Sequence, residues 1–182
     1  MPHRLPVVIF LLLCLPVLTG CQGTAPEHPQ QWGPIAFDTP VPFSAPSEIG
    51  LDAVRLRFPA GSAPEESRLE LTLVLASKDY VESLGGRKEL LSNMTSVFLG
   101  LTEYEAAEPR HFLGASVAGW KAMSTIPRML YWEFHLVPLT DGSRVLVALA
   151  RSDETTPEEA SKVLDLVSRT FREREAGATG GE

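Results

Sequence analysis

Apolar and polar residues alternate along several stretches of this 182-residue chain, and this two-residue period is what most restricts its fold. The segment 68–77 reads RLELTLVLAS, which places four leucines on one side of an extended strand. The segment 51–59, LDAVRLRFP, alternates in the same way, with Arg55 and Arg57 opposite its apolar face. The loop-forming sequence GSAPEES joins the two segments, so we expect them to form an antiparallel hairpin.

A second hairpin is predicted over 128–152, where two apolar runs flank the dipeptide Asp141-Gly142. This dipeptide suits a two-residue turn, in which both positions need positive φ. Such a turn would set the register through three cross-strand pairs: Leu136 with Val147, Phe134 with Leu149, and Trp132 with Arg151. Upstream we expect two further strands, one from about residue 110 and one over 120–126, separated by a bend near Ala118-Gly119.

The apolar period changes to that of a helix in two places. Over 86–101 the apolar residues fall at spacings of one, three and four, which makes a single helical stripe. A shorter helical turn, capped by Ser77, precedes this helix. Over 155–175, Thr156 and Glu159 form the pattern of a capping box, and Pro157 stands at the first helical position. Strands joined by tight turns, together with these helices, predict an α+β fold: an antiparallel β-sheet with helices packed on it.

The first 20 residues have the composition of an export signal. A short basic head precedes an apolar run over 5–17 that is too short to span a bilayer. The run ends in Leu18-Thr19-Gly20-Cys21, which resembles the bacterial lipobox. The resemblance implies cleavage before Cys21 and attachment of acyl chains that together give stable membrane anchoring. Because Gln22 and not Asp follows, it further implies the outer membrane, facing the periplasm; the alternative is an ordinary secretory signal with a chance cysteine.

These features divide the chain into four parts. Residues 1–20 are the predicted lipoprotein signal peptide, and 21–34, rich in Gly, Pro and Gln, are a predicted flexible tether. Residues 35–174 are predicted to form a single α+β domain, and 175–182 a disordered tail.

The net charge and the cysteines restrict the partners. The formal net charge is −7, and loss of Arg4 with the leader would leave −8. A mildly acidic chain without a basic stripe repels phosphate backbones, so we expect no nucleic acid partner. Cys14 and Cys21 both precede the predicted domain, so the mature chain would hold one cysteine and no internal disulfide.

The chain contains no recognisable catalytic constellation, so we expect neither an enzyme nor a cofactor. The sequence GASVAG places Ser116 in a near match to a nucleophile elbow, but Ala118 stands where that motif requires glycine. The residues that could ligate a metal lack any recognised spacing, and no metal is expected; they are His111, His135, Glu108 and Glu133.

Three aromatic residues, Trp120, Trp132 and Phe134, fall within the predicted strands. Aromatic side chains of this kind pack in a core or on a sheet face, and they can also stack against a ligand. We therefore keep these three residues as a candidate ligand-binding site.

The order of elements resembles that of PsbP-like and DcrB-like domains over about 37–171. The segments that carry the resemblance are VRLRFP, GRKELLSNMTSVFLGL, VAGWKAMS, TDGSRVLVALARS and VLDLVSRTF, the last of which departs from the family's closing SF. The resemblance implies an envelope or lumenal domain that supports other complexes, usually without catalysis. It implies no catalytic residues.

We therefore expect a membrane-anchored bacterial envelope lipoprotein, lipidated on Cys21, with a non-enzymatic domain that binds an envelope protein or supports an assembly. One alternative is a carrier or sensor of an apolar small molecule, seated between sheet and helices near Trp120 and Trp132. Another is a serine hydrolase that uses Ser116.

Overall fold

The computed structural model describes residues 27–125 and 127–174, and its centre is an antiparallel sheet in the order β3-β4-β5-β9-β8-β7-β6. Its strands are β3 (Ser47–Gly50), β4 (Ala53–Phe58), β5 (Leu69–Ala76), β6 (Glu105–Phe112), β7 (Ala115–Ser124), β8 (Leu130–Pro138) and β9 (Arg144–Arg151). A smaller antiparallel sheet, in the order β1-β2-β10, consists of β1 (His28–Trp32), β2 (Ile35–Thr39) and β10 (Arg172–Glu173). The helices are α1 (Lys78–Ser83), α2 (Arg87–Met94), its π-helical continuation η1 (Thr95–Leu99), and α3 (Pro157–Thr170).

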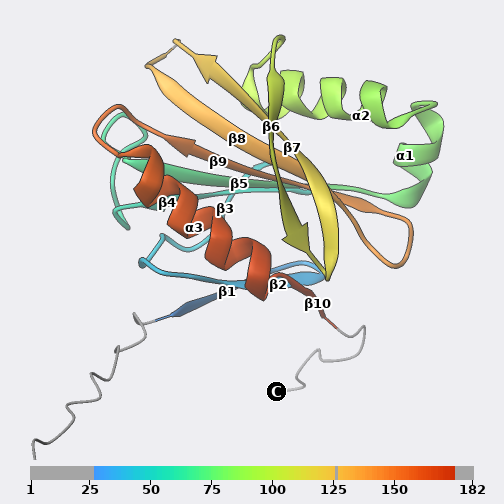
Figure 1. The fold of residues 1–182 in the computed structure, drawn as a ribbon, viewed down its shortest axis with the longest axis horizontal. Helices are drawn as coiled ribbons and strands as arrows, with labels where there is room; N and C mark the ends of the chain where they lie inside the picture. Colours follow the sequence, from blue (N-terminus) through green and yellow to red (C-terminus); the bar gives the residue numbers. More distant parts are fainter. Residues whose placement is uncertain (1–26, 126, 175–182) are drawn as a thin grey trace, which may run out of the picture.

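Both faces of the large sheet are covered, which confirms the α+β class. Figure 1 shows α3 and the small sheet against one face, and α2 packs on the opposite face. In β5, Leu71 and Leu73 point to the α3 side and are fully buried, while Val74 and Ala76 are buried on the α2 side. Burial of each large aliphatic side chain in these two cores contributes about 1.5–3 kcal/mol.

The predicted helix caps are confirmed. At the start of α3, Thr156 Oγ1 accepts a hydrogen bond from Glu159 N at 3.2 Å, and Glu159 Oε2 accepts one from Thr156 N at 3.0 Å. Ser77 Oγ accepts from Tyr80 N at 3.3 Å at the start of α1. In the part of the chain that the structure describes, every helix falls short of the length and apolar composition needed to cross a bilayer.

The β8–β9 hairpin differs from the prediction by one residue in register. Trp132 pairs with Ala150, Phe134 with Ala148, and Leu136 with Leu146. The predicted two-residue turn is wrong because the loop has three residues: Leu139 N donates to Ser143 O at 3.0 Å. Within this loop only Gly142 has positive φ, at 90°, while the Asp141 carboxylate accepts from Ser143 N at 2.8 Å.

A one-residue shift moves each partner residue to the opposite face of the sheet. Phe134 therefore meets the small side chain of Ala148 and not Leu149. The space above these small residues on the α2 side is filled by α2 and by large aromatic rings.

The bend predicted near Ala118-Gly119 is also wrong. The chain turns earlier, at Leu113-Gly114, where both residues have positive φ (52° and 78°), as a two-residue hairpin requires. A leucine rarely adopts this conformation, so the sequence did not indicate the turn. Strand β7 then continues unbroken past residues 118 and 119.

The tether predicted over 21–34 is wrong for its last part. The structure places His28–Trp32 in β1, which pairs with β2 along its whole length. Trp32 packs against the core on the α3 side, and this apolar contact outweighs the polar composition of the flanking residues. Residues 21–26, like the predicted leader and tail, lie outside the described residues.

Candidate functional site

A groove runs along the α3 side of the large sheet, between α3 and strands β6, β7 and β8; we call it the α3 groove. It consists of two adjoining hollows of about 730 Å³ and about 860 Å³, which share Lys121, Glu133 and Pro157 as lining residues. The first hollow extends to Met123 and Tyr131, and the second lies between β6 and α3. The α3 groove is our candidate functional site.

The groove forms because α3 covers only part of this face. The helix contacts β2, β6 and β9, and the apolar core residues of β2 and β9 lie beneath it. Farther along the same face, Glu105, Lys121 and Glu133 lie opposite one another across β6, β7 and β8. These polar side chains form a floor that does not require an apolar cover, so the edge of the sheet stays open beside the helix.

One arginine joins the floor of the groove to its helical wall. Arg110 Nε donates to Glu133 Oε1 at 2.7 Å, and Arg110 Nη2 donates to Ser161 Oγ at 3.1 Å. Arg110 Nη1 also bonds Asp165 on α3. Only 12% of the Arg110 side chain is exposed, so this charge-assisted network fixes the position of α3 on the sheet.

The carboxyl of Glu133 is held in its ionised form. Burial alone would raise the pKa of Glu133, but the hydrogen bonds and charges of His135 and Arg110 lower it to about 2. His135 Nε2 lies 3.4 Å from Glu133 Oε1, and the imidazole is fully buried. Among the described residues, His135 Nδ1 has no hydrogen-bond partner. These contacts place an anchored carboxylate at the centre of the floor.

The charges along the α3 groove nearly cancel. Lys121 Nζ lies 3.2 Å from Glu105 Oε1, and the Arg151 guanidinium stacks 4.1 Å from the centre of the Tyr131 ring. A partner in the groove therefore needs no strong net charge. The acidic lining residues are Glu103, Glu105, Glu108, Glu133 and Asp165, and the basic ones are Arg110, Lys121, Arg151 and Arg169.

The three aromatic candidates lie mainly in the core on the α2 side. Phe134 is fully buried, with Trp120 stacked on it at 6.2 Å and Tyr104 edge-on at 5.6 Å. Arg87 of α2 lies over the Trp120 ring at 5.3 Å. Trp132 is 4% exposed and donates its indole N–H to Ser124 Oγ at 3.1 Å; of the three, only Trp132 also borders the α3 groove.

Ser116 is an exposed residue of β7, opposite His111 on β6. It lies inside a strand, just after a hairpin turn, and not at the strand-to-helix turn of a nucleophile elbow. Over residues 27–125 and 127–174, no three His, Cys, Asp or Glu side chains gather where they could hold a metal ion. Cys21, the predicted lipidation site, lies outside the described residues.

The sequence did not reveal the residues that build the α3 groove. Arg110 and Asp165 are 55 positions apart, and Arg110 and Glu133 are 23 apart. No short motif connects them; only the pairing of β6 with β7 and β8 and the packing of α3 bring them together. An arginine that lies mostly covered beside two carboxylates can be recognised only in the three-dimensional structure.

No known protein family and no curated protein sequence matches this chain. Its fold is similar to that of a mutant of the protein Mog1, with a TM-score of 0.49 and 15% identity over 81% of this chain and 95% of that one. It is also similar to LpqN, described as involved in cell envelope biogenesis of Mycobacterium tuberculosis, with a TM-score of 0.46 and 13% identity over 80% of this chain and 89% of that one. Similarity at this level says nothing about activity or partners.

Proposed function

We propose that this chain is a bacterial envelope lipoprotein whose domain binds an envelope protein in the α3 groove and catalyses no reaction. Acyl chains on Cys21 hold the protein at the membrane, on the outer membrane facing the periplasm. The lipobox Leu18-Thr19-Gly20-Cys21 and the following Gln22 support the anchor and its location.

The observation that carries the binding role is the open α3 groove with its internally paired charges. A small-molecule site is usually concave and mostly apolar, whereas this trough is lined by nine charged side chains. Its accessible floor and rim offer Met123, Tyr131 and Arg151, residue types that are enriched at protein interfaces. Met123 is 56% exposed and its flexible thioether adapts to a partner's surface.

The anchor and the domain are close together. Six residues, 22–27, separate Cys21 from His28, where β1 begins, and the seven steps along the chain span at most about 25 Å. A domain on so short a connection meets partners that lie in, or next to, the same membrane.

The test is site-specific photocrosslinking from the native envelope. A photoreactive residue replaces Met123 in the groove or, in the matched control, Val97 on η1, which is 65% exposed. We expect one protein to crosslink from position 123 and not from position 97. Its crosslink should disappear when Tyr131→Ala and Lys121→Ala alter the groove floor. Equal crosslinking from both positions, or none from position 123, would contradict the proposed interface.

A further inference from the structure

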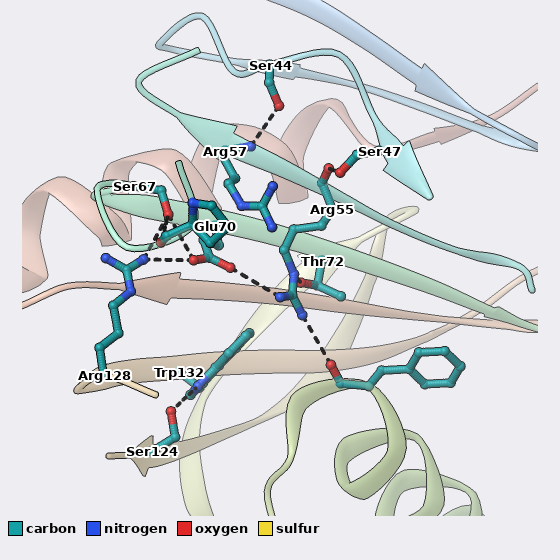
Figure 2. A network of polar contacts seen from close by, with 12 residues as sticks. Ser44, Ser47, Arg55, Arg57, Ser67, Glu70, Thr72, Ser124, Arg128 and Trp132 are labelled. Carbon is teal, nitrogen blue, oxygen red and sulfur yellow. Dashed lines mark hydrogen bonds and ion pairs between the residues drawn. The ribbon is translucent and has the colours of Figure 1, made fainter. Parts of the chain in front are cut away.

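The α2-side face of the large sheet carries three arginines around one buried carboxylate, which we call the arginine cluster: Arg55, Arg57, Arg128 and Glu70 (Figure 2). Arg128 Nη2 donates to Glu70 Oε1 at 2.7 Å, and Arg55 Nη1 lies 3.4 Å from Glu70 Oε2. Ser67 Oγ donates to the same Oε1 at 2.9 Å. The Glu70 side chain is 5% exposed, and both of its oxygens are already in use.

Glu70 forms ion pairs with Arg55 and Arg128 and leaves Arg57 as the third arginine of the cluster. Arg57 lies directly opposite Glu70 in the pairing of β4 with β5. Its Nε is buried, and among the described residues it has no hydrogen-bond partner. Figure 2 shows no bond between its guanidinium and the other residues drawn. Three guanidinium groups and one carboxylate leave an excess of positive charge at this place, in a chain whose net charge is −7.

The excess charge is unfavourable in the isolated protein. Burial lowers the pKa of the Arg55 guanidinium, and the charge of Arg57 adds to this effect against the opposite influence of Glu70. Arg55 also donates from Nε to Thr72 Oγ1 at 3.1 Å and from Nη2 to the carbonyl of Phe98 at 3.2 Å. An incoming oxyanion would pair with Arg57 and balance the cluster, because a planar guanidinium suits phosphate oxygens.

We propose that the arginine cluster binds the phosphate group of an anionic phospholipid, in the leaflet that holds the acyl chains of Cys21. This inference rests on the proposed lipid anchor. Anchoring of a lipoprotein is firmer when a basic site adds to the acyl chains, since each basic side chain near an anionic surface strengthens the attachment.

The cluster lies within reach of the lipid anchor, although the cluster and β1 lie on opposite sides of the large sheet. Thr39 Oγ1 donates to the carbonyl of His28, so the end of β2 is next to the start of β1. Five residues later, Ser44 N donates to Arg57 O at 2.8 Å and Ser44 Oγ accepts from Arg57 N at 3.0 Å. Five residues span at most about 18 Å, and the chain from Cys21 to His28 spans at most about 25 Å, so the anchor can bring Arg57 to the membrane surface.

The experiment uses the full lipidated chain with Ser47→Cys, an exposed position beside Arg55. The thiol of Cys21 carries the lipid, so a fluorophore labels the introduced thiol alone. The labelled protein is reconstituted into vesicles with a nitroxide quencher in the headgroup region. The vesicles contain either phosphatidylcholine alone or a mixture with phosphatidylglycerol. We expect more of the fluorescence to be quenched when phosphatidylglycerol is present. The ratio of molecules whose cluster touches the membrane to molecules whose cluster does not should rise roughly five-fold.

Arg57→Gln should abolish this rise without unfolding the protein, because the buried Nε of Arg57 has no hydrogen-bond partner among the described residues and Figure 2 shows no bond from its guanidinium to the other residues drawn. Lys162→Gln removes the same formal charge from an exposed position on α3 and should leave the rise unchanged. Equal quenching in both vesicles, or an unaltered rise in Arg57→Gln, would overturn the proposal. Binding of inorganic phosphate that depends on Arg57, without a phosphatidylglycerol effect, would assign the site to free phosphate and also overturn it.

Failure of the lipid anchor gives a different result. A chain that enters vesicles of neither composition would contradict the acylation of Cys21. If such a chain still cosediments with phosphatidylglycerol vesicles and not with phosphatidylcholine vesicles, the result supports phosphate binding by the arginine cluster. If it is absent from both pellets, the result overturns that proposal too.

Discussion

Gly119 lies where two strands and a buried ring approach closely. A Cβ atom at this position would be 2.5 Å from the carbonyl oxygen of Glu108 and 2.7 Å from His135 Cε1. Neither group can move away easily, because one is backbone and the other is fully buried. We predict that Gly119→Ala lowers the free energy of unfolding by about 1–3 kcal/mol, as measured by urea denaturation.

Gly86→Ala is the matched control for this substitution. The new Cβ would lie 2.6 Å from Glu89 Oε2, which is the end of a flexible, exposed side chain. We expect this variant to keep most of the wild-type stability. Equal losses in the two variants would show that the contacts of Gly119 are not the cause.

Glu133 makes a pH-dependent contribution to stability. Its pKa in the folded protein is about 2, below the ordinary value of 4.5, so its ionised form stabilises the fold above about pH 4.5. That contribution is lost as the pH falls from 4.5 towards 2. We predict that Glu133→Gln is less stable than the wild type at pH 7, and that the difference shrinks through this acidic range. A difference that stays constant with pH, measured by urea unfolding, would contradict the assigned pKa.

At the scale of single elements, the capping box of α3 gives a direct prediction. Thr156→Ala removes the acceptor for Glu159 N and should cost about 0.5–2 kcal/mol of unfolding free energy. Thr156→Ser keeps the hydroxyl and should stay close to the wild type. Thermal and urea unfolding of the two variants measure the cap, and an undiminished stability of Thr156→Ala would show that the cap contributes nothing.

Local signals in the sequence were sufficient for the helices and for the alternation of strands. The residues that start α1 and α3 lie within three positions of the helix end that they cap, so short-range chemistry is enough to predict where each helix begins. They are Ser77, Thr156, Pro157 and Glu159. The β8–β9 register is different, because the residues TDGS are compatible with a two-residue and a three-residue loop. The Asp141 carboxylate favours the longer loop by accepting a hydrogen bond from Ser143 N. The longer loop shifts β9 by one residue against β8, so each residue of β8 pairs with a different residue of β9 from the one predicted.

At the scale of the molecule, the sequence was least informative about which segments share a layer. β2 and β10 lie side by side, with Ala36 opposite Arg172, although they come from the two ends of the folded part. The α3 groove depends on the same kind of long-range contact, since Arg110 joins strand β6 to Asp165 on α3. Periodicity and turn chemistry predict elements, and the site appears only when the sheet order and the position of α3 are known.

The central claim is that acyl chains on Cys21 hold this domain at a membrane. Its most direct test is the intact mass of the full chain extracted from the bacterial envelope, compared with that of Cys21→Ala. We predict that the wild-type mass is that of a chain beginning at Cys21 with added acyl groups, and that the variant lacks this species. A wild-type chain that carries no acyl mass, or that retains residues 1–20, would contradict the account.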